Sequence, residues 1–358
     1  IDEYNFEDRK LIEIVKATYF NPKIVVIDET TTALSQEGRE ELYKHMERIR
    51  KSGNTVIFIS HDLPEIIEKS DTITILRDGV YIDTVKSKDV NENDLKKLMV
   101  GREVTGDYYR SDYGEKISDE VVLSAKHVTV PGLIEDVSFD LHKGEILGFG
   151  GLSESGMHEI GKAIFGASYD REGTVELADG TQINDIPTAI KHSIAYTSKD
   201  RDNESVVLNQ SIGDNICLPS LDELSGPAHL ISDKKKKDFA NKFAKQMSVK
   251  MVDVNQFVSN LSGGNKQKVV LARWIGKDSD IVVLDSPTRG IDIKVKQDIY
   301  QLMNQMRKNG KSIIMISEEL MELIGMCDRI VIMKDGKISG ELERDQNLDE
   351  NGLITMMV

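Results

Sequence analysis

An internal repeat constrains this chain more than any other feature of its sequence. Four pairs of segments are alike, separated by 257 residues except for the last pair, which is separated by 258: Ile24–Asp28 and Ile281–Asp285, Ile59–Ser60 and Ile316–Ser317, Asp71–Gly79 and Asp328–Gly336, and Leu98–Val100 and Met356–Val358. Because one offset holds through several successive elements, we expect two copies of one domain rather than a chance likeness.

The repeat predicts where the two copies lie. The second copy begins near Glu120, where the apolar run Val121–Leu123 follows a polar stretch, and it extends over residues 120–358. Only the C-terminal part of the first copy, residues 1–100, is recognisable, so about 140 residues of that copy are expected to be missing from this chain. Residues 101–119 contain three glycines and no apolar periodicity, which predicts a linker.

Apolar runs that alternate with amphipathic segments predict an α/β fold. In the first copy, β-branched runs predict strands at 23–28, 54–60 and 72–77, with a helix over 36–51. We expect the first two strands to be buried on both faces. The second copy repeats the order strand, helix, strand at 281–285, 294–308 and 312–317. This order favours a parallel sheet with right-handed crossovers, and the stretch over about 202–275 predicts a helical insertion.

Composition excludes several classes of protein. Hydrophobic residues are 39% of the 358 and charged residues 30%, which leaves enough apolar material for packed cores and excludes a disordered chain. No apolar run approaches the roughly 20 residues needed to cross a bilayer. The net charge of −15 argues against a protein that binds nucleic acid through bulk positive charge. Cys217 and Cys327 are too few for a disulfide framework or a metal cluster, so we expect reduced packing residues.

The segment Leu261–Lys268, which reads Leu-Ser-Gly-Gly-Asn-Lys-Gln-Lys, carries the strongest functional signal. It opens a predicted helix over 267–276 and precedes the strand that ends in Asp285. Two glycines let a phosphate approach the backbone, and a helix N-terminus offers unpaired N–H groups, to which Ser262 adds a hydroxyl. An ordinary N-cap is the alternative. The strand behind the helix favours phosphate binding.

These residues resemble the ATP-binding subunits of ABC transporters, and the resemblance covers essentially the whole chain. It is carried by the signature at 261–268, by the strand and acid at 281–285 with Ser286-Pro287-Thr288, and by Asp28-Glu29-Thr30-Thr31. Two such domains on one chain, with Ser198-Lys199-Asp200-Arg201 and Pro287–Asp292, resemble the tandem ATPases of bacterial importers for ribose, galactose or xylose. The resemblance implies a P-loop NTPase fold of the ABC type, with a mixed sheet core and a helical subdomain. It also implies ATP and Mg²⁺ as cofactors, with ATP contacting Ser262, Gly263, Gly264 and Gln267.

The phosphate-binding loop of the second copy has lost its charged residues. A P-loop reads Gly, four residues, Gly-Lys-[Ser/Thr], in which the lysine contacts phosphate and the hydroxyl holds Mg²⁺. Here the glycines remain as Gly151 and Gly156, but Met157 replaces the lysine, His158 replaces the hydroxyl and Glu154 adds a negative charge. The loop, with Gly151, Ser153, Ser155 and Gly156, can be a weak nucleotide cradle or a structural turn.

Other positions of the second copy also lack the residue types that ATP hydrolysis needs. Ser286 follows Asp285 where a general base is expected, and Glu318 stands where the first copy has His61. Lys199 stands at what resembles the family's Gln/Glu loop position, which contacts water and metal. Of the metal-binding groups that the resemblance implies, Asp285 alone remains.

The first copy shows the complementary pattern. Asp28 ends its strand and can hold Mg²⁺ through water, while the adjacent Glu29 is a carboxylate placed for a general base. His61 follows the next strand, at the same edge of the sheet. The first copy's counterpart of the signature, Tyr4–Leu11, lacks both glycines and the serine.

In ABC ATPases two domains pair head to tail, so the resemblance implies two composite sites. One combines Asp28, Glu29 and His61 with the signature of the second copy and is expected to hydrolyse ATP. The other combines the altered second-copy loop with the broken signature and is degenerate. The family further implies two transmembrane permease subunits and an extracytoplasmic sugar-binding protein as partners, no nucleic acid, and a peripheral location at the cytoplasmic face of the cell membrane. We expect this chain alone to be inactive.

Two other functions share these motifs. A soluble tandem ATPase that acts on ribosomes or DNA would need a basic surface and two intact sites, which the net charge and the altered site oppose. A non-hydrolysing nucleotide-binding regulator would leave Glu29 and His61 without a role. Importers of nucleosides or autoinducers also stay open, since the permease and the binding protein choose the substrate.

Overall fold

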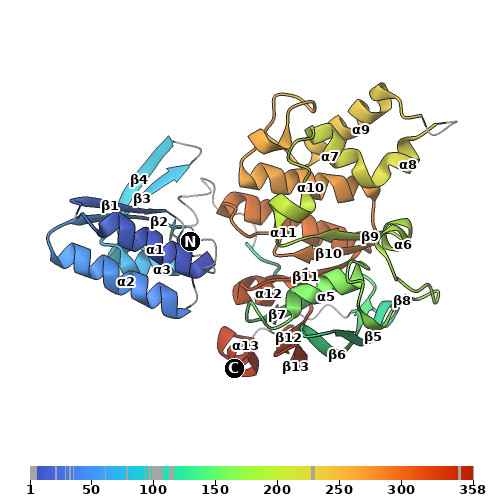
Figure 1. Cartoon of the computed structure of the whole chain (residues 1–358), viewed down its shortest axis with the longest axis horizontal. Coiled ribbons are helices and arrows are strands. Elements are labelled where there is room, and N and C mark those ends of the chain that lie inside the picture. Colours follow the sequence, from blue (N-terminus) through green and yellow to red (C-terminus); the bar gives the residue numbers. More distant parts are fainter. Residues whose placement is uncertain are drawn as a thin grey trace. The chain divides into compact units, whose positions relative to one another are not determined.

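The computed structural model describes residues 6–20, 22–28, 30–31, 34, 36–60, 62–77, 80–92, 94–95, 98, 108–112, 117–226, 230–345 and 348–357. Two compact units make up the chain, one formed by Ile1–Gly106 with Asp292–Lys294 and one by Asp107–Ile291 with Val295–Val358. In Figure 1 the first unit is blue to cyan, and the second runs from green to red. No helix in the described part of the chain is both long enough and apolar enough to cross a membrane.

The first unit alternates helices and strands. Its elements are α1 (Phe6–Thr18), β1 (Ile24–Asp28), α2 (Gln36–Lys51), β2 (Thr55–Ile59), α3 (Leu63–Lys69), β3 (Thr72–Arg77) and β4 (Val80–Lys86). Strands β1 and β2 pair in parallel with Asp28 opposite Ile59, and β3 pairs with β4 in the antiparallel sense. The predicted helix and the three predicted strands of this copy are confirmed to within a residue at each end.

The parallel strands of the first unit bury only one face. Val25 and Ile27 belong to a small core with Leu42 of α2, whereas Ile24 and Val26 are 59% and 58% exposed. The expectation that β1 and β2 are buried on both faces is therefore wrong for the described part of this unit. The reason is that α2 packs on one side of these strands. In the second unit the helix over 157–164 covers the other side of the corresponding strands, and the 257-residue offset puts its counterpart before Ile1.

The second unit is built on a six-stranded sheet in the order β13-β12-β7-β11-β10-β9. All of its neighbours are parallel except β12 and β13, which makes the sheet mixed. Every residue of β7, β10 and β11 is buried. The strands of this sheet are β7 (Ile146–Gly151), β9 (Ile194–Thr197), β10 (Ile281–Asp285), β11 (Ser312–Ile316), β12 (Arg329–Lys334) and β13 (Lys337–Glu343).

A second, antiparallel sheet and several helices complete this unit. The sheet has the order β6-β5-β8, from β5 (Val121–Val130), β6 (Ile134–His142) and β8 (Glu172–Leu177). The helices are α5 (Met157–Ile164), α6 (Ile186–Lys191), α7 (Ile212–Cys217), α8 (Leu221–Leu224), α9 (Asp233–Gln246), α10 (Gly263–Lys277), α11 (Ile293–Lys308), α12 (Leu320–Met326) and α13 (Glu350–Met357). Figure 1 shows α7, α8 and α9 gathered beside α10 at the end of the unit opposite the antiparallel sheet.

Helix α5 covers the face of β10 and β11 that would otherwise be open. A Cβ on Gly161 of α5 would come within 2.9 Å of both Ile316 and Tyr196, so only glycine allows the helix to lie this close to the sheet. Cys217 and Cys327 are buried and free, as expected. Burial raises the pKa of Cys217 to about 11, which suits a packing residue rather than a reactive thiol.

Part of the segment predicted as a linker packs on the second unit. Arg110 is 4% exposed, and its Nη2 lies 2.7 Å from Asp328 Oδ1 while its Nε lies 2.9 Å from Asp112 Oδ1. The ring of Tyr109 lies 5.3 Å from that of Tyr300, centroid to centroid. Residues 108–112 are irregular in conformation, yet they are fixed by a buried ion pair and an aromatic contact.

Candidate functional site

The loop between β7 and α5 is built around two glycines. A Cβ on Gly151 would lie 2.2 Å from Ser155 Oγ and 2.7 Å from the carbonyl oxygen of Met333. Gly156 has φ +89° and precedes α5, and a Cβ there would lie 2.7 Å from the carbonyl oxygen of Leu133. Both positions therefore require glycine, which is the backbone shape that a phosphate-binding loop needs.

The side chains that replace the usual P-loop residues turn inward. Met157 is fully buried, so it packs in the core and offers nothing to a phosphate. His158 is also buried, and its Nδ1 lies 2.7 Å from Asp285 Oδ1. Ser155 Oγ is buried and has no hydrogen-bond partner among the described residues. The loop keeps the backbone of a phosphate site, but the described contacts of this loop include no cationic side chain that belongs to it.

A cation from another strand approaches the loop. Lys199 follows β9, and its Nζ lies 2.7 Å from Glu318 Oε1 and 3.1 Å from His158 Nε2. The same oxygen of Glu318 accepts a hydrogen bond from Ser153 Oγ at 2.9 Å. Ser153, His158, Lys199 and Glu318, together with Asp285, form one network, which we call the second-copy network. It ties the loop to the carboxyl ends of β9, β10 and β11.

Charge pairing perturbs two members of the second-copy network. Burial lowers the pKa of His158, but its hydrogen bonds to Asp285 and Glu318 outweigh burial and raise the pKa above its ordinary value. The hydrogen bond with His158, followed by the contact with Lys199, holds the pKa of Glu318 well below its usual range. Glu318 is therefore an ion-paired carboxylate in this structure and not a free negative charge.

These residues do not fit a magnesium ion. Asp285, to which the sequence pattern assigned Mg²⁺, has its Oδ1 within 3.2 Å of both His158 Nδ1 and Ser286 Oγ. Its Oδ2 lies 3.5 Å from the hydroxyl of Tyr196. Among the described residues, no three His, Cys, Asp or Glu side chains gather as metal ligands.

Ser286 has φ +49°, a left-handed conformation that is uncommon outside glycine and typical of functional sites.

The signature segment forms the start of α10. Ser262 is the N-cap residue, but its side chain makes no capping hydrogen bond. Its Oγ instead accepts a hydrogen bond from Asn265 Nδ2 at 3.0 Å, and Ser262 is exposed, so its hydroxyl hydrogen is available to a ligand. The side chain of Ser262 therefore does not act as an ordinary N-cap. Gly263 and Gly264 form the first turn, while Gln267 is 4% exposed and has little surface to offer.

Comparison with known proteins identifies the family of this chain. The family model described as ABC transporter matches residues 134–289. A ribose import ATP-binding protein, RbsA, of Lactococcus lactis subsp. lactis is 40% identical over 344 residues, which cover 96% of this chain and 69% of that protein. A xylose import ATP-binding protein, XylG, of Thermoanaerobacter pseudethanolicus is 42% identical over 350 residues, which cover 94% and 68%. The chain belongs to the ATP-binding subunits of ABC transporters.

Solved structures confirm the expected ABC ATPase fold. The dimeric structure of MJ0796, a bacterial ABC transporter cassette, aligns with a TM-score of 0.55 at 22% identity, covering 62% of this chain and 99% of that one. A nucleotide-free ATP-binding cassette from an ABC transporter aligns with a TM-score of 0.55 at 17% identity, covering 66% and 99%. The α/β fold class, with its mixed sheet and helical region, is therefore confirmed for this member of the family.

The family's catalytic positions in the first unit are only partly described. Asp28 ends β1 with its side chain exposed, where a carboxylate can ligate a metal through water. Glu29 and His61 lie outside the described residues, as do Tyr4 and Asn5 of the altered signature. The neighbours of the two catalytic candidates, Thr31 and Ser60, are described and both bind one buried carboxylate, which the sequence analysis did not single out.

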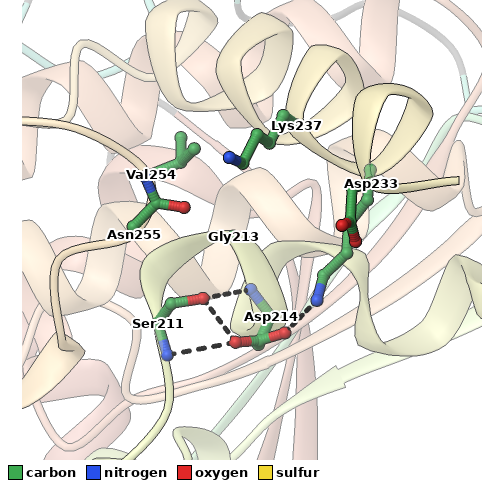
Figure 2. A pocket seen from close by; sticks show the side chains of 8 residues that line it. Ser211, Gly213, Asp214, Asp233, Lys237, Val254 and Asn255 are labelled. Carbon is green, nitrogen blue, oxygen red and sulfur yellow. Dashed lines mark hydrogen bonds and ion pairs between the residues drawn. The ribbon is translucent and has the colours of Figure 1, made fainter.

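A hollow in the helical part of the second unit has a structural explanation. Figure 2 shows it, with a volume of about 310 Å³, lined by Ser211, Gly213, Asp214, Asp233, Lys236, Lys237, Val254 and Asn255. Ser211 and Asp214 form the capping box of α7, and Lys236 pairs with Asp214. These contacts satisfy the start of a helix, so we assign no ligand to this hollow.

Proposed function

We propose that this chain is part of the ATP-hydrolysing subunit of a bacterial-type importer for a monosaccharide such as ribose or xylose. The names of relatives at 40% and 42% identity support this choice of solute. Galactose remains an alternative within the same group, as the name of a further relative, a putative ribose/galactose/methyl galactoside import ATP-binding protein, indicates. The solute itself would be selected by partner subunits.

One composite site is proposed to hydrolyse ATP. It combines Asp28, Glu29 and His61 of the first copy with Ser262 and Gly263–Gly264 of the second, in the head-to-tail pairing that family resemblance implies. In this site Glu29 would accept a proton from the attacking water, and Ser262 with the N-terminus of α10 would bind the γ-phosphate. When bound, Mg²⁺ supplies charge neutralisation at the phosphates, and Asp28 is the residue that would hold it.

The other composite site is proposed to be non-hydrolytic. The observation that carries this asymmetry is the second-copy network, in which His158 and Lys199 pair with the carboxylates at the strand ends. Ser286 has no group that can abstract a proton from water at neutral pH. We infer that this site contributes binding and domain pairing rather than turnover, with Gly151, Ser153, Ser155 and Gly156 as its remaining phosphate contacts.

We further propose that the subunit works at the cytoplasmic face of the cell membrane. Its partners would be two transmembrane permease subunits and an extracytoplasmic sugar-binding protein, without nucleic acid. The net charge of −15 gives no attraction to an anionic membrane surface, so attachment would depend on the permease.

Reconstitution tests the proposed function. The longer protein that the internal repeat predicts, with a complete first copy, is assembled with its permease subunits and binding protein in lipid vesicles. We expect ATP-dependent uptake of ribose or xylose, and none with Glu29→Gln. ATP hydrolysis without uptake of any pentose or hexose would contradict the assignment to sugar import.

A further inference from the structure

A buried carboxylate joins the segments that follow β1 and β2 in the first unit. Glu65, in the first turn of α3, is 6% exposed. Its Oε2 accepts hydrogen bonds from Thr31 Oγ1 at 3.1 Å and from Ser60 Oγ at 2.7 Å, and its Oε1 accepts one from the hydroxyl of Tyr43. Thr31 lies three residues after the end of β1, and Ser60 follows β2 directly. One side chain therefore connects two adjacent strand ends.

Further hydrogen bonds hold the chain on both sides of residue 61. Ser60 Oγ donates to Glu65 and also accepts a hydrogen bond from the N–H of Asp62 at 3.0 Å. The carboxylate of Asp62 in turn accepts the N–H of Glu65 at 3.1 Å and caps α3. The carbonyl oxygen of Thr31 accepts a hydrogen bond from Arg39 Nε at 3.1 Å. The backbone that flanks position 61 is thus closed into a ring of hydrogen bonds that returns to Glu65.

The second unit repeats this arrangement at the offset of the internal repeat. Glu322 is fully buried, and its Oε1 accepts hydrogen bonds from the hydroxyls of Thr288 and Tyr300. Its Oε2 accepts one from Ser317 Oγ at 2.8 Å, and Ser317 Oγ accepts the N–H of Glu319 at 3.0 Å. The four residue types are the same in both units, whereas the residues at the catalytic positions differ. The second unit also has Lys296, whose Nζ lies 3.6 Å from Glu322 Oε1.

Physical chemistry gives this carboxylate a specific effect. A buried ionised carboxylate is costly unless hydrogen bonds satisfy it, and here three hydroxyls donate to it. Such charge-assisted bonds are short and roughly twice as strong as neutral ones, so they hold their partners in place. For a general base and a γ-phosphate contact, a shift of about 1 Å can cost about a hundredfold in rate. A group that holds the two strand ends together therefore affects turnover without touching ATP.

We propose that Glu65 is a positioning residue for ATP hydrolysis, which holds together the two segments that carry Glu29 and His61. The inference rests on the proposed function, because it takes those two residues as catalytic. Glu322 has the same local role in the second unit, where Ser286 and Glu318 occupy the corresponding positions and no turnover is expected.

The internal repeat supplies a matched control for the experiment. Glu65→Gln and Glu322→Gln are made in the longer protein, and steady-state ATP hydrolysis is measured with the permease present. Glutamine keeps the shape, but its amide nitrogen cannot accept a hydrogen bond, so at least one hydroxyl loses its acceptor. We expect Glu65→Gln to lower kcat about ten- to a hundredfold with KM for ATP changed less than about twofold. Glu322→Gln should leave kcat within about twofold, although both variants lower the melting temperature.

A purely structural role would give a different result. If Glu65 only stabilised its unit, both variants would lower thermal stability and neither would lower kcat per folded molecule, which would overturn the proposal. Equal losses of kcat from both variants would also overturn it. If Glu65→Gln fails to fold, Ser60→Ala with Ser317→Ala makes the same comparison with one hydrogen bond removed, and an unchanged kcat in Ser60→Ala counts against the proposal. A wild-type protein without any ATP hydrolysis would overturn the proposed function, and this inference with it.

Discussion

Strands β1 and β2 and their counterparts β10 and β11 share sequence, pairing and register, yet they are buried to very different extents. Asp28 pairs with Ile59 in the first unit as Asp285 pairs with Ile316 in the second. Ile24 is 59% exposed while its counterpart Ile281 is 5% exposed. Helix α5 covers β10 and β11 in the second unit, whereas the 257-residue offset puts its counterpart before Ile1. The residue pattern therefore encodes the strand and its partner, while burial depends on a helix distant in the sequence.

At the carboxyl ends of these strands the surroundings are alike in the two units, whereas the residues at the catalytic positions differ. Both ends keep a hydrogen-bonded frame, a buried glutamate that accepts hydrogen bonds from a threonine, a serine and a tyrosine, centred on Glu65 in one unit and Glu322 in the other. The residue at the position of the general base differs, because Asp28 is followed by Glu29 and Asp285 by Ser286. We expect changes in the frame to lower the thermal stability of both units, whereas ATP turnover should respond only to changes in the first unit, and the following predictions test that contrast.

The largest expected effect concerns the residue after the strand-end aspartate. In the longer protein, Glu29→Gln should lower ATP turnover by about 10² to 10⁴, because general base catalysis is lost. Ser286→Ala should change turnover by less than about twofold, because the second-copy site is proposed to be non-hydrolytic. Steady-state phosphate release measures both. Equal losses would mean that the two copies are not asymmetric.

The next effect compares one core position in the two copies. Ile316 is fully buried, whereas its counterpart Ile59 is 45% exposed. Ile316→Ala should lower the free energy of unfolding of the second unit by about 2–5 kcal/mol. Denaturant unfolding followed by the fluorescence of Trp274, the one tryptophan in the chain, reports on that unit alone. Ile59→Ala should lower the stability of the first unit by less than about 1 kcal/mol, measured by amide hydrogen exchange in β1 and β2. A loss as large as that from Ile316→Ala would contradict the burial difference.

The segment between the copies gives a third test. Arg110→Ala removes a buried partner from Asp328 and Asp112, although Arg307 Nε remains 3.2 Å from Asp328 Oδ2. We expect a loss of about 3 kcal/mol in the Trp274 transition, at the low end for a broken buried ion pair. The control is Lys143→Ala, which breaks an exposed pair with Glu120 and should cost less than about 1 kcal/mol. Equal effects would show that residues 108–112 do not stabilise the second unit.

The smallest effect concerns magnesium at the second-copy loop. This chain should bind ATP only in the high-micromolar to millimolar range. Met157 replaces the P-loop lysine, and the loss of that charge-assisted contact with phosphate weakens binding about ten- to a hundredfold. Because His158 and Lys199 already pair with the carboxylates, replacing Mg²⁺ by EDTA should change the dissociation constant less than about threefold. Calorimetric titration measures this.

Matched variants locate that binding. Lys199→Gln should weaken the residual affinity. Lys162→Gln removes an ammonium of α5 that pairs with Glu204 and should leave the affinity unchanged. Micromolar binding that requires Mg²⁺ would show that the loop keeps an ordinary nucleotide site.

The sequence predicted the three strands of the first copy and the helix over 36–51, because each leaves a local periodic pattern. It missed the open face of β1 and β2, since burial of a strand depends on elements distant in the chain. The second-copy network was out of reach for the same reason: Ser153, Lys199 and Glu318 converge only after the sheet has formed.

Two other features, the hydroxyl–carboxylate cluster and the packing of residues 108–112, have a pattern in the sequence. Thr31, Tyr43, Ser60 and Glu65 each recur as the same residue type 257 positions later, and that coincidence alone would have marked the hydroxyl–carboxylate cluster. The packing of residues 108–112 had a weaker signal, two adjacent tyrosines followed by an arginine within a polar stretch.

The cluster around Glu322 also bears on how a duplicated ATPase can diverge. Its carboxylate and three hydroxyls persist beside Ser286 and Glu318, where hydrolysis is no longer expected. A gene copy that relaxed all of its constraints together would lose this costly buried carboxylate along with the catalytic base. The cluster beside a serine at the position of the base shows that this buried frame does not depend on the residue at the catalytic position, so that position can change while the unit keeps its fold.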